Sequence, residues 1–264
     1  MRQQPPEFTI ITSSLNASST IEQCLVSVQN QKNVSLEHII IDGASSDGTY
    51  DIIKKIAEDD QRIKHKSEPD NGIYEAWNKG VDQASGSWIL FLGADDYLLE
   101  GNVLHEVQKK ISLSADSLAF ISCRCRRVAG NDTSAVSRQG NRKFIENPYD
   151  GPTFSMPPQP SLLHAKAIFN SGARFDENYA TAADKKLFLS FFGVASIQYI
   201  DVMTTCFTMG GVTNRDGNKI KRWFEKERMR KELNLPIVFY PYSRSFLSAV
   251  YRDLIFLVHR ALPG

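Results

Sequence analysis

Short apolar runs alternate with amphipathic stretches through the first hundred residues of the chain. The apolar runs have the length and composition of strands and cover residues 8–13, 38–42, 63–67 and 88–92. After each of the first three, apolar side chains recur at helical spacing, over residues 19–31, 50–58 and 73–84. Ser19 and Glu22 have the spacing of a capping box at the start of the first helix. The alternation predicts an α/β fold with a mostly parallel central sheet flanked by helices.

The pattern is less regular after residue 100. We expect helices over residues 102–111, 164–171 and 183–192, strands over 117–128 and 197–209, a polar loop over 129–140 and an irregular Pro-rich crossing over 147–160. Residues 1–215 are therefore predicted to form one α/β domain. Residues 216–264 are predicted to form a C-terminal helical extension.

Two adjacent acidic residues follow the last of the four apolar runs in the sequence. Asp95 and Asp96 would repel each other and lose hydration at the tip of a buried strand unless a cation compensated their charge. Carboxylate oxygens suit Mg²⁺ and Mn²⁺. The pair therefore predicts a divalent metal site, with Mn²⁺ or Mg²⁺ as cofactor. The alternative is that both side chains only cap a helix that begins near Asn102.

Polar and acidic residues follow each predicted strand. They are Ser13, Ser14 and Asn16; Asp42, Gly43, Ser45 and Asp47; Glu68, Asp70, Asn71 and Gly72; and Asp95 and Asp96. Ligands gather at the carboxyl ends of strands in an open parallel sheet, so these residues are candidates for a binding site. Asp47 or Asp70 alone is equally well explained as a helix cap. The chain lacks the glycine-rich patterns of dinucleotide-binding and P-loop proteins, so phosphates would have to be held through a metal.

Composition argues against several classes of protein. A net charge of +1, without basic tracts interleaved with aromatic residues, argues against nucleic acid as a partner. No run of about eighteen apolar residues could span a bilayer, and the first ten residues lack the apolar core of a signal peptide. We therefore expect a soluble, cytoplasmic protein. The four cysteines are scattered, which favours reduced structural thiols over zinc ligands.

Five segments, taken in order, resemble a known family. They are FTIITSSLN, EHIIIDGASSDGT, SEPDNGIYEAWNKG, GSWILFLGADD and FDENYATAADKKLFL, within about residues 8–215. Together they are similar to the family 2 inverting glycosyltransferases, and to the subset that makes bacterial surface polysaccharides. The resemblance implies the Rossmann-like GT-A fold, a nucleotide-sugar donor such as a UDP-sugar, and a glycan or lipid-linked acceptor. It also implies a divalent cation and a single displacement with inversion.

The resemblance assigns roles to individual residues. Asp184 matches the catalytic base, which takes the proton of the acceptor hydroxyl. Asp95 and Asp96 match the D-x-D element, in which Asp96 binds the metal and Asp95 helps to position ribose or the donor sugar. The remaining residues for nucleotide-sugar binding are Ser13, Asp42 and Asp70, which match positions that hold uracil and ribose, and the neighbouring Asn16, Gly72 and Lys79.

The chain departs from the family pattern in several places. Lys185 and Lys186 follow Asp184, where an aromatic residue and a second acid are common. Relatives place a His-Gln pair near the acceptor, whereas this chain offers Gln159 and His164, and a structural role for His164 stays open. A K-x-x-R-W sequence echoes the Q-x-x-R-W of processive synthases. We treat this echo as chance and expect the transfer of a single sugar.

The C-terminal part of the chain is basic. From residue 219 onward ten Lys and Arg accompany four Asp and Glu, a net charge of +6, against −5 for the preceding residues. The basic side chains around residues 215–222 would either contact a diphosphate or lie in solvent. Apolar residues at helical spacing over 243–262 predict an amphipathic helix. That helix would either lie on the inner face of the cytoplasmic membrane as a peripheral contact or pack back onto the domain.

These observations predict a metal-dependent inverting glycosyltransferase of polysaccharide biosynthesis. A rival enzyme class is a sugar nucleotidyltransferase, but residues 13–19 contain neither the glycines nor the basic side chains of its nucleotide-binding loop. A non-enzymatic rival is a nucleotide-sugar-binding module that has lost its base. For such a module, the substitution Asp184→Asn would change nothing.

Overall fold

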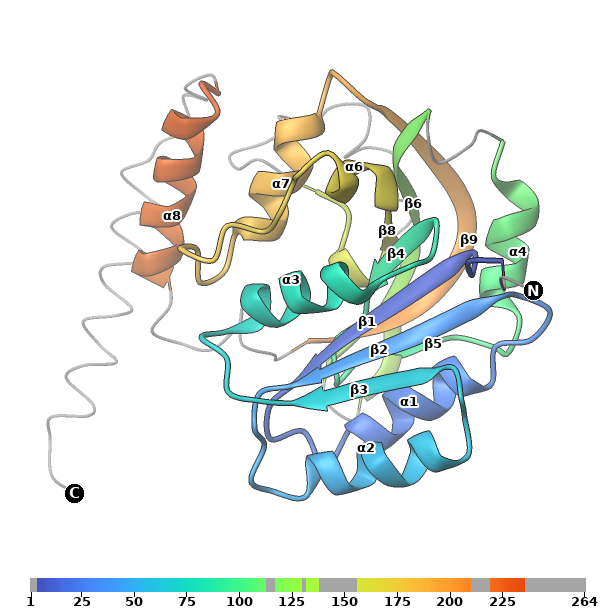
Figure 1. Ribbon diagram of the computed structural model, residues 1–264. Coiled ribbons are helices and arrows are strands. Elements are labelled where there is room, and N and C mark those ends of the chain that lie inside the picture. The colour runs from blue at the N-terminus through green and yellow to red at the C-terminus, as the bar shows by residue number, and fades with distance from the viewer. Residues whose placement is uncertain (1–3, 113–116, 130–131, 138–155, 210–218, 236–264) are drawn as a thin grey trace, which may run out of the picture.

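The first half of the chain forms the predicted alternation of strands and helices. A computed structural model describes residues 4–112, 117–129, 132–137, 156–209 and 219–235 (Figure 1). Its first elements are β1 (Phe8–Ser14), α1 (Ile21–Gln29), β2 (Leu36–Asp42), α2 (Thr49–Glu58), β3 (Ile63–Ser67), α3 (Ile73–Gln83) and β4 (Trp88–Phe91). Strand β1 pairs in parallel with β2 and β4, and β3 pairs in parallel with β2. The carboxyl ends of these four strands therefore meet at one edge of the sheet.

The second half extends the same sheet with antiparallel pairs. Its elements are β5 (Tyr97–Leu98), α4 (Val103–Lys110), β6 (Leu118–Ala129), β7 (Asp132–Ser137), the 3₁₀ helix η1 (Gln159–Ser161), β8 (Leu162–Ala165), α6 (Lys166–Asn170), α7 (Ala183–Phe191), β9 (Ser196–Met209) and α8 (Lys219–Glu232). Among the described residues the strands form one nine-stranded sheet, ordered β3-β2-β1-β4-β8-β6-β9-β5, with β7 paired to β6. The predicted α/β fold is confirmed, and its parallel half is the half that carries the predicted strand-end residues.

Three local predictions are wrong. The helix expected from His164 begins only at Lys166, because Leu162–Ala165 is wholly buried and pairs with β4 and β6. The polar loop expected over 129–140 contains β7, whose pairing with β6 rests on backbone hydrogen bonds that a hydrophobic pattern does not reveal. The capping box at Ser19 is not formed, since the N-cap of α1 is Thr20 and its hydroxyl donates to the Ala17 carbonyl oxygen.

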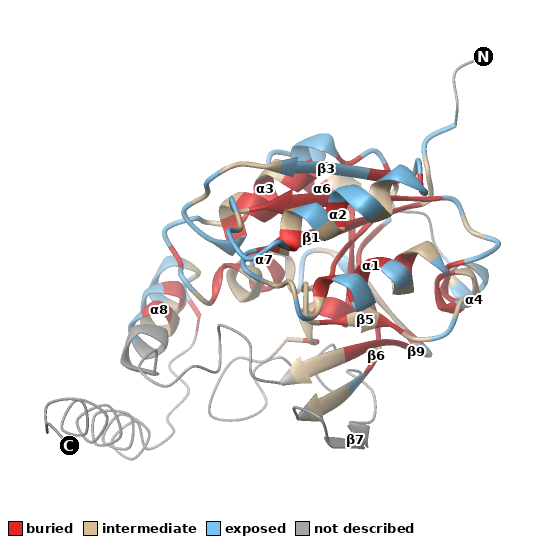
Figure 2. Cartoon of the chain, turned by 90° about the horizontal axis from the view of Figure 1, so that it is seen from below, coloured by how far each residue is buried: buried red, intermediate tan, exposed pale blue. Residues whose placement is uncertain are grey.

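Strands β1 and β4 are buried on both faces of the sheet. Ile10 and Leu90 belong to a core cluster together with residues of α1 and α4, whereas Ile11 and Phe91 belong to a second cluster with residues of α3 and α7. Successive side chains of a strand point to opposite faces, so continuous apolar runs are required here. Figure 2 shows β1 as buried, between helices whose outer faces are exposed.

Helix α3 lies unusually close to the sheet. A Cβ atom at Gly80 would stand only 2.6 Å from Cγ2 of Ile11 in β1, so only glycine allows this approach. The helix begins at the carboxyl edge of the parallel strands, directly after Gly72. Close packing of α3 therefore fixes the position of its first turn relative to the strand ends.

Helix α8 packs onto the segment that leads into α7 (Figure 1). Met229 of α8 is fully buried and Leu235 is 9% exposed, and both belong to the core cluster that contains Tyr179 and Ala183. The described part of the predicted extension thus contributes to the core, while the predicted boundary at residue 215 and the predicted amphipathic helix over 243–262 lie outside the described residues. In the part of the chain that the structure describes, no helix has the length and apolar character needed to cross a membrane.

Candidate active site

Asp42, expected to bind a nucleotide directly, instead ties three strand ends together. Its Oδ1 accepts hydrogen bonds from the hydroxyls of Ser14 (2.9 Å) and Ser45 (2.5 Å). Its Oδ2 accepts from the Ser45 backbone N–H (2.9 Å) and the Ser67 hydroxyl (2.7 Å). The carboxylate is fully buried and each oxygen already has two donors, which is its ordinary capacity. Asp42 therefore joins the three strand ends, and its expected contact with a nucleotide stays a prediction.

Asp70 occupies the space directly above Gly43. Its Oδ2 lies 2.9 Å from the point that a Cβ atom at Gly43 would occupy, and the Cδ1 atom of Leu15 lies 3.5 Å from the same point. The Asp70 carboxylate also accepts a hydrogen bond from the Gly72 backbone N–H (2.9 Å), and burial raises its pKa. Gly72 has φ of 138°, a conformation that favours glycine. A partly exposed carboxylate and an exposed leucine therefore stand side by side at the strand ends.

The other predicted donor-binding residues have different surroundings. Ser13 is the one residue of β1 that is not buried. The Asn16 side-chain oxygen accepts a hydrogen bond from the Ser46 backbone N–H (3.0 Å), which joins the loops after β1 and β2. The Lys79 ammonium pairs with Glu75 (2.8 Å) and Glu68 (3.2 Å) within the β3–α3 segment. The structure therefore gives Asn16 and Lys79 roles in holding the loops that surround the strand ends.

Asp47 is an exposed residue that joins the loops after β1 and β2. Its carboxylate accepts hydrogen bonds from the backbone N–H groups of Ser18 and Thr49, both at 3.0 Å. The second bond satisfies the backbone donor of Thr49 at the start of α2, but the N-cap of this helix is Gly48, so Asp47 lies one residue before the cap.

Asp95 and Asp96 direct one oxygen each toward the same point above Gly93. Asp95 Oδ1 and Asp96 Oδ2 both lie 2.8 Å from where a Cβ atom at Gly93 would stand. Strand β9 holds the pair from the other side. The Thr208 backbone N–H donates to Asp96 Oδ1 (2.9 Å), and the Thr208 hydroxyl donates to the Asp95 carbonyl oxygen (2.7 Å). The two carboxylates are therefore held beside one another in a space that a larger residue at position 93 would fill.

This pair of carboxylates fits a divalent cation. Asp96 is 4% exposed, and burial together with the neighbouring charge of Asp95 raises its pKa to about 8. Two carboxylates in such surroundings are stabilised as anions by a bound cation. The described residues contain no group of three or more acidic, His or Cys ligands. Mg²⁺ and Mn²⁺ suit this donor set, because they accept one or two carboxylates and complete their coordination with water and phosphate oxygens.

Asp184 lies in the first turn of α7 and contacts the first turn of α3. The Tyr74 hydroxyl donates a hydrogen bond of 3.1 Å to Asp184 Oδ1. Tyr74 is 6% exposed and stacks on Phe175, with 5.8 Å between ring centroids. Burial raises the pKa of Asp184, while Lys185 and the Tyr74 hydroxyl lower it. The carboxylate is therefore held in a fixed orientation near the strand ends, in surroundings that increase its basicity.

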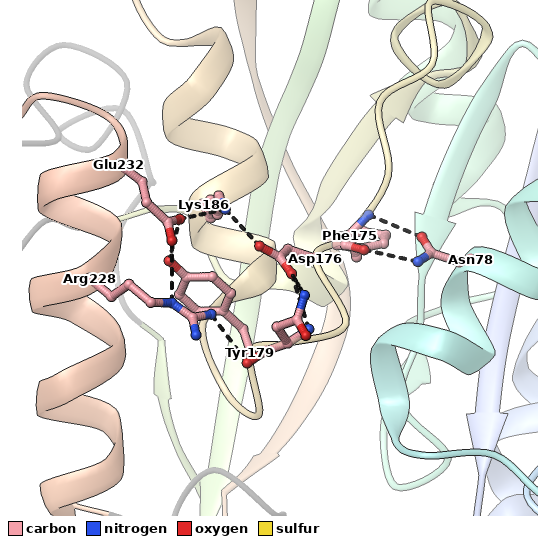
Figure 3. A network of polar contacts seen from close by, with 8 residues as sticks. Asn78, Phe175, Asp176, Tyr179, Lys186, Arg228 and Glu232 are labelled. Carbon is pink, nitrogen blue, oxygen red and sulfur yellow. Dashed lines mark hydrogen bonds and ion pairs between the residues drawn. The ribbon is translucent and has the colours of Figure 1, made fainter.

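The two lysines after Asp184 have separate environments. Burial lowers the pKa of Lys185, and the charge of Asp184 acts in the opposite direction. Lys186 forms ion pairs with Asp176 (2.7 Å) and Glu232 (2.6 Å), as Figure 3 shows. Lys186 therefore belongs to the contact between α7 and α8. Of the two lysines, only Lys185 affects the pKa of Asp184.

The two predicted acceptor residues are placed differently by the structure. His164 lies in β8 and is fully buried, with ring centroids 5.1 Å from Phe91 and 5.2 Å from Phe120. Burial lowers the pKa of His164 to about 3, so its imidazole is neutral at physiological pH. Gln159 in η1 is partly buried, and its Nε2 lies 3.5 Å from Nε2 of His164. A direct acceptor contact by His164 is therefore corrected to a core position, and Gln159 stays a prediction.

Sequence reasoning missed Tyr74 and Thr208. Tyr74 stands in a segment that carries the family resemblance, but nothing in the sequence links it to Asp184, 110 residues away. Thr208 lies 112 residues after Asp96, near the end of a predicted strand, and no pattern connects the two. Such contacts depend on the folded topology and have no local signal.

Comparison with known proteins identifies relatives of this chain. The family described as "Glycosyl transferase family 2" matches residues 9–169, more than half of the chain. The Campylobacter jejuni GalNAc(5)-diNAcBac-PP-undecaprenol beta-1,3-glucosyltransferase is 36% identical over 185 residues, 66% of this chain and 56% of that protein. A Mycobacterium bovis PGL/p-HBAD biosynthesis glycosyltransferase is 41% identical over 103 residues, 39% of this chain and 40% of that protein. The matches thus span about half the length of these curated relatives.

Solved structures show the same fold at low sequence identity. S. aureus TarS 1–349 in complex with UDP-GlcNAc aligns with a TM-score of 0.69 and 17% identity, over 90% of this chain and 69% of that chain. The mannosyltransferase PcManGT from Pyrobaculum calidifontis, in complex with GDP-Man and Mn²⁺, aligns with a TM-score of 0.62 and 17% identity, over 99% and 77%. The fold is that of the GT-A glycosyltransferases. By its match to the family model, the chain belongs to glycosyl transferase family 2.

Proposed function

We propose that the protein transfers one sugar from a nucleoside-diphosphate sugar, UDP-linked, to a glycan or lipid-linked acceptor with inversion at the anomeric carbon. The observation that carries this proposal is the pair of carboxylates of Asp95 and Asp96, directed at one point above Gly93 and held there by Thr208. Family 2 membership and the partly buried Asp184 beside the same edge of the sheet support it.

The nucleotide would bind over the ends of β1, β2 and β3. Leu15 is 62% exposed next to Gly43 and Asp70, and it offers an apolar surface to a base while Asp70 accepts a hydrogen bond from base or ribose. Ser13 adds a hydroxyl at the exposed end of β1. Asp42 supports this surface through its hydrogen bonds from Ser14, Ser45 and Ser67.

Asp96 would hold the divalent cation, and Asp95 would orient the ribose or donor sugar beside it. A bound Mg²⁺ or Mn²⁺ would neutralise the charge that develops on the departing nucleoside diphosphate. The chain's own contribution is to keep the two carboxylates adjacent through Gly93 and Thr208. A solved structural neighbour in complex with Mn²⁺ supports this choice of metal.

Asp184 would act as the base. As the acceptor oxygen forms its bond to the anomeric carbon and the bond to the diphosphate breaks, the hydroxyl proton passes to the Asp184 carboxylate. A pKa raised by burial makes this carboxylate a better proton acceptor, and the Tyr74 hydroxyl holds its orientation. Attack from the side opposite the leaving group inverts the configuration.

The acceptor is inferred from relatives alone. One relative is named for an undecaprenol-linked substrate and another for PGL/p-HBAD biosynthesis, which supports a lipid-linked or glycan acceptor in surface-polysaccharide biosynthesis. We infer that this protein works at the cytoplasmic face of the membrane. Family membership disfavours the sugar nucleotidyltransferase alternative.

The test is nucleoside diphosphate release from a panel of nucleotide sugars with Mn²⁺ or Mg²⁺, followed by mass spectrometry. Wild type, Asp96→Asn and Asp184→Asn would be compared, with Asp51→Asn as control because Asp51 lies at the surface of α2 and pairs only with Lys54 among the described ion pairs. We expect metal-dependent release from one donor, lost in Asp96→Asn. Asp184→Asn should lose transfer but keep donor binding. If no donor bound in a metal-dependent way, the proposal would be excluded. Full transfer by Asp184→Asn would exclude Asp184 as the base.

A further inference from the structure

Glu225 of α8 binds the backbone of the segment that leads into α7. Its Oε1 accepts a hydrogen bond from the Ala180 N–H (2.5 Å), and its Oε2 accepts from the Thr181 N–H (3.0 Å) and the Thr181 hydroxyl (2.8 Å). The Glu225 side chain is buried, with the residue 9% exposed. One carboxylate thus holds three donors from two successive residues, which gives the segment a single defined position.

This segment sets the start of the helix that carries Asp184. Ala182 is the N-cap of α7 and forms no side-chain capping hydrogen bond, and Asp184 lies in the first turn. Residues 180 and 181 immediately precede that N-cap. The position of the Asp184 carboxylate therefore depends on the segment that Glu225 fixes, in addition to the hydrogen bond from Tyr74.

Helix α8 has an independent means of attachment. Arg228 lies over the Tyr179 ring at 3.8 Å from the ring centroid, and Glu232 accepts hydrogen bonds from the Tyr179 hydroxyl (2.7 Å) and from Lys186 (2.6 Å), as Figure 3 shows. Met229 is buried in the core on the same face of the helix. Docking of α8 therefore rests on several contacts, and Glu225 is the contact that reaches the segment before Asp184.

We propose that Glu225 is a positioning residue for Asp184, acting through the backbone of Ala180 and Thr181. The inference rests on the proposed function, in which Asp184 is the base. The carboxylate is required because both of its oxygens accept hydrogen bonds. A glutamine has one acceptor oxygen and an NH₂ group that would face a backbone N–H donor. A displaced base lowers the rate of the chemical step, since a misplacement of about 1 Å costs roughly a hundredfold.

The test compares Glu225→Gln with Glu227→Gln, the same substitution two residues along α8. Glu227 pairs with Arg230 of its own helix, and none of its hydrogen bonds or ion pairs among the described residues reaches the segment before α7, so it controls for the change of charge. We expect Glu225→Gln to lower kcat for transfer by about tenfold or more, with the dissociation constant of the donor unchanged. Glu227→Gln should keep the wild-type kcat. Glu225→Asp, which retains both acceptor oxygens, should recover part of the loss.

A second variant separates positioning from helix docking. Glu232→Gln weakens the attachment of α8 to Tyr179 and Lys186 but leaves the hydrogen bonds of Glu225 in place. If the two variants lose the same amount of thermal stability, the kcat of Glu225→Gln should fall further than the kcat of Glu232→Gln. Three outcomes would overturn the proposal. The first is that Glu225→Gln and Glu232→Gln have the same kcat at the same thermal stability. The others are a kcat of Glu225→Gln within twofold of wild type, and a rise in its donor dissociation constant that parallels the loss of kcat.

The double variant Glu225→Gln/Asp184→Asn distinguishes this inference from the proposed function. If Glu225 acts through Asp184, its substitution should leave the residual rate of Asp184→Asn unchanged. If Asp184→Asn retains full transfer, the proposed base is wrong. If Asp184→Asn is inactive while Glu225→Gln is fully active, only the positioning role is wrong.

Discussion

The Tyr74 hydroxyl donates a hydrogen bond of 3.1 Å to Oδ1 of Asp184 across 110 residues of sequence. The two residues stand in the first turns of α3 and α7, two helices that begin near the carboxyl edge of the sheet. Phe175 stacks on the Tyr74 ring, and Asn78 binds both the N–H and the carbonyl oxygen of Phe175 (Figure 3). The orientation of Asp184 is therefore set by α3 as much as by its own helix.

Replacing Tyr74 by Phe should shift the pH dependence of transfer. A hydrogen bond to the ionised carboxylate lowers the pKa of Asp184, so removing it raises that pKa. Because the base acts when deprotonated, the acid limb of the kcat profile should move to higher pH. The control is Tyr50→Phe, whose hydroxyl faces His65. Superimposable profiles of Tyr74→Phe and wild type would contradict the proposed role of this bond.

Asp96→Asn should stabilise the metal-free protein at neutral and alkaline pH. The pKa of Asp96 is raised in the folded state to about 8, from an ordinary value of 3.8. The folded state therefore holds a proton that the unfolded state has lost between these values, and stability falls as pH rises across this window. The variant should gain at least about 1 kcal/mol near pH 8, and the gain should vanish near pH 4. Thermal unfolding with EDTA measures this, and Mn²⁺ should raise the Tm of wild type only.

Gly93→Ala should abolish metal-dependent activity while leaving the fold intact. The new Cβ atom would stand 2.8 Å from an oxygen of each of Asp95 and Asp96, closer than packing allows, so the carboxylates must move apart. Mn²⁺ affinity, measured by titration calorimetry, should fall by about tenfold or more. The control is Gly193→Ala, where strained backbone costs about 1 kcal/mol without any atom in contact. If Gly93→Ala retained the wild-type affinity for Mn²⁺, the metal would not bind between Asp95 and Asp96.

Asp42→Asn should destabilise the protein more than a surface substitution of the same kind. An asparagine keeps one acceptor oxygen and brings an NH₂ group against the hydroxyl and N–H donors of Ser45 and Ser67. The free energy of unfolding should fall by about 1–3 kcal/mol, measured by urea denaturation. Asp51→Asn at the surface of α2 should change it by less than about 0.5 kcal/mol. Equal stability of the two variants would show that the Asp42 network contributes nothing.

The sequence was sufficient for the parallel half of the fold. Apolar runs such as the one before Asp95 are buried on both faces of a sheet, and helical spacing identified α2 and α3 almost to the residue. Acidic residues at the strand ends followed from the same reasoning, whereas metal binding at Asp96, implied by the family resemblance, stays a prediction. The family resemblance, carried by five segments, is confirmed by the match over residues 9–169.

The sequence was insufficient where contacts are distant in the chain. The pattern leading into His164 suits a buried strand as well as a helix, and only pairing with β4 decides between them. The support that Asp42 gives to the strand ends was not predicted, because its three serine partners lie in three separate segments of the chain. The hydrogen bonds from Thr208 to Asp96 and from Ala180 to Glu225 join segments with no sequence relation.

Helix α3 links the proposed donor surface to the proposed base. Its first turn begins beside Asp70, at that surface, and carries Tyr74, which donates a hydrogen bond to Asp184. Gly80 seats the same helix closely against Ile11, so this first turn keeps one position relative to the sheet. Both halves of the proposed site therefore depend on the same anchored helix, and a larger residue at position 80 should disturb donor binding and catalysis together.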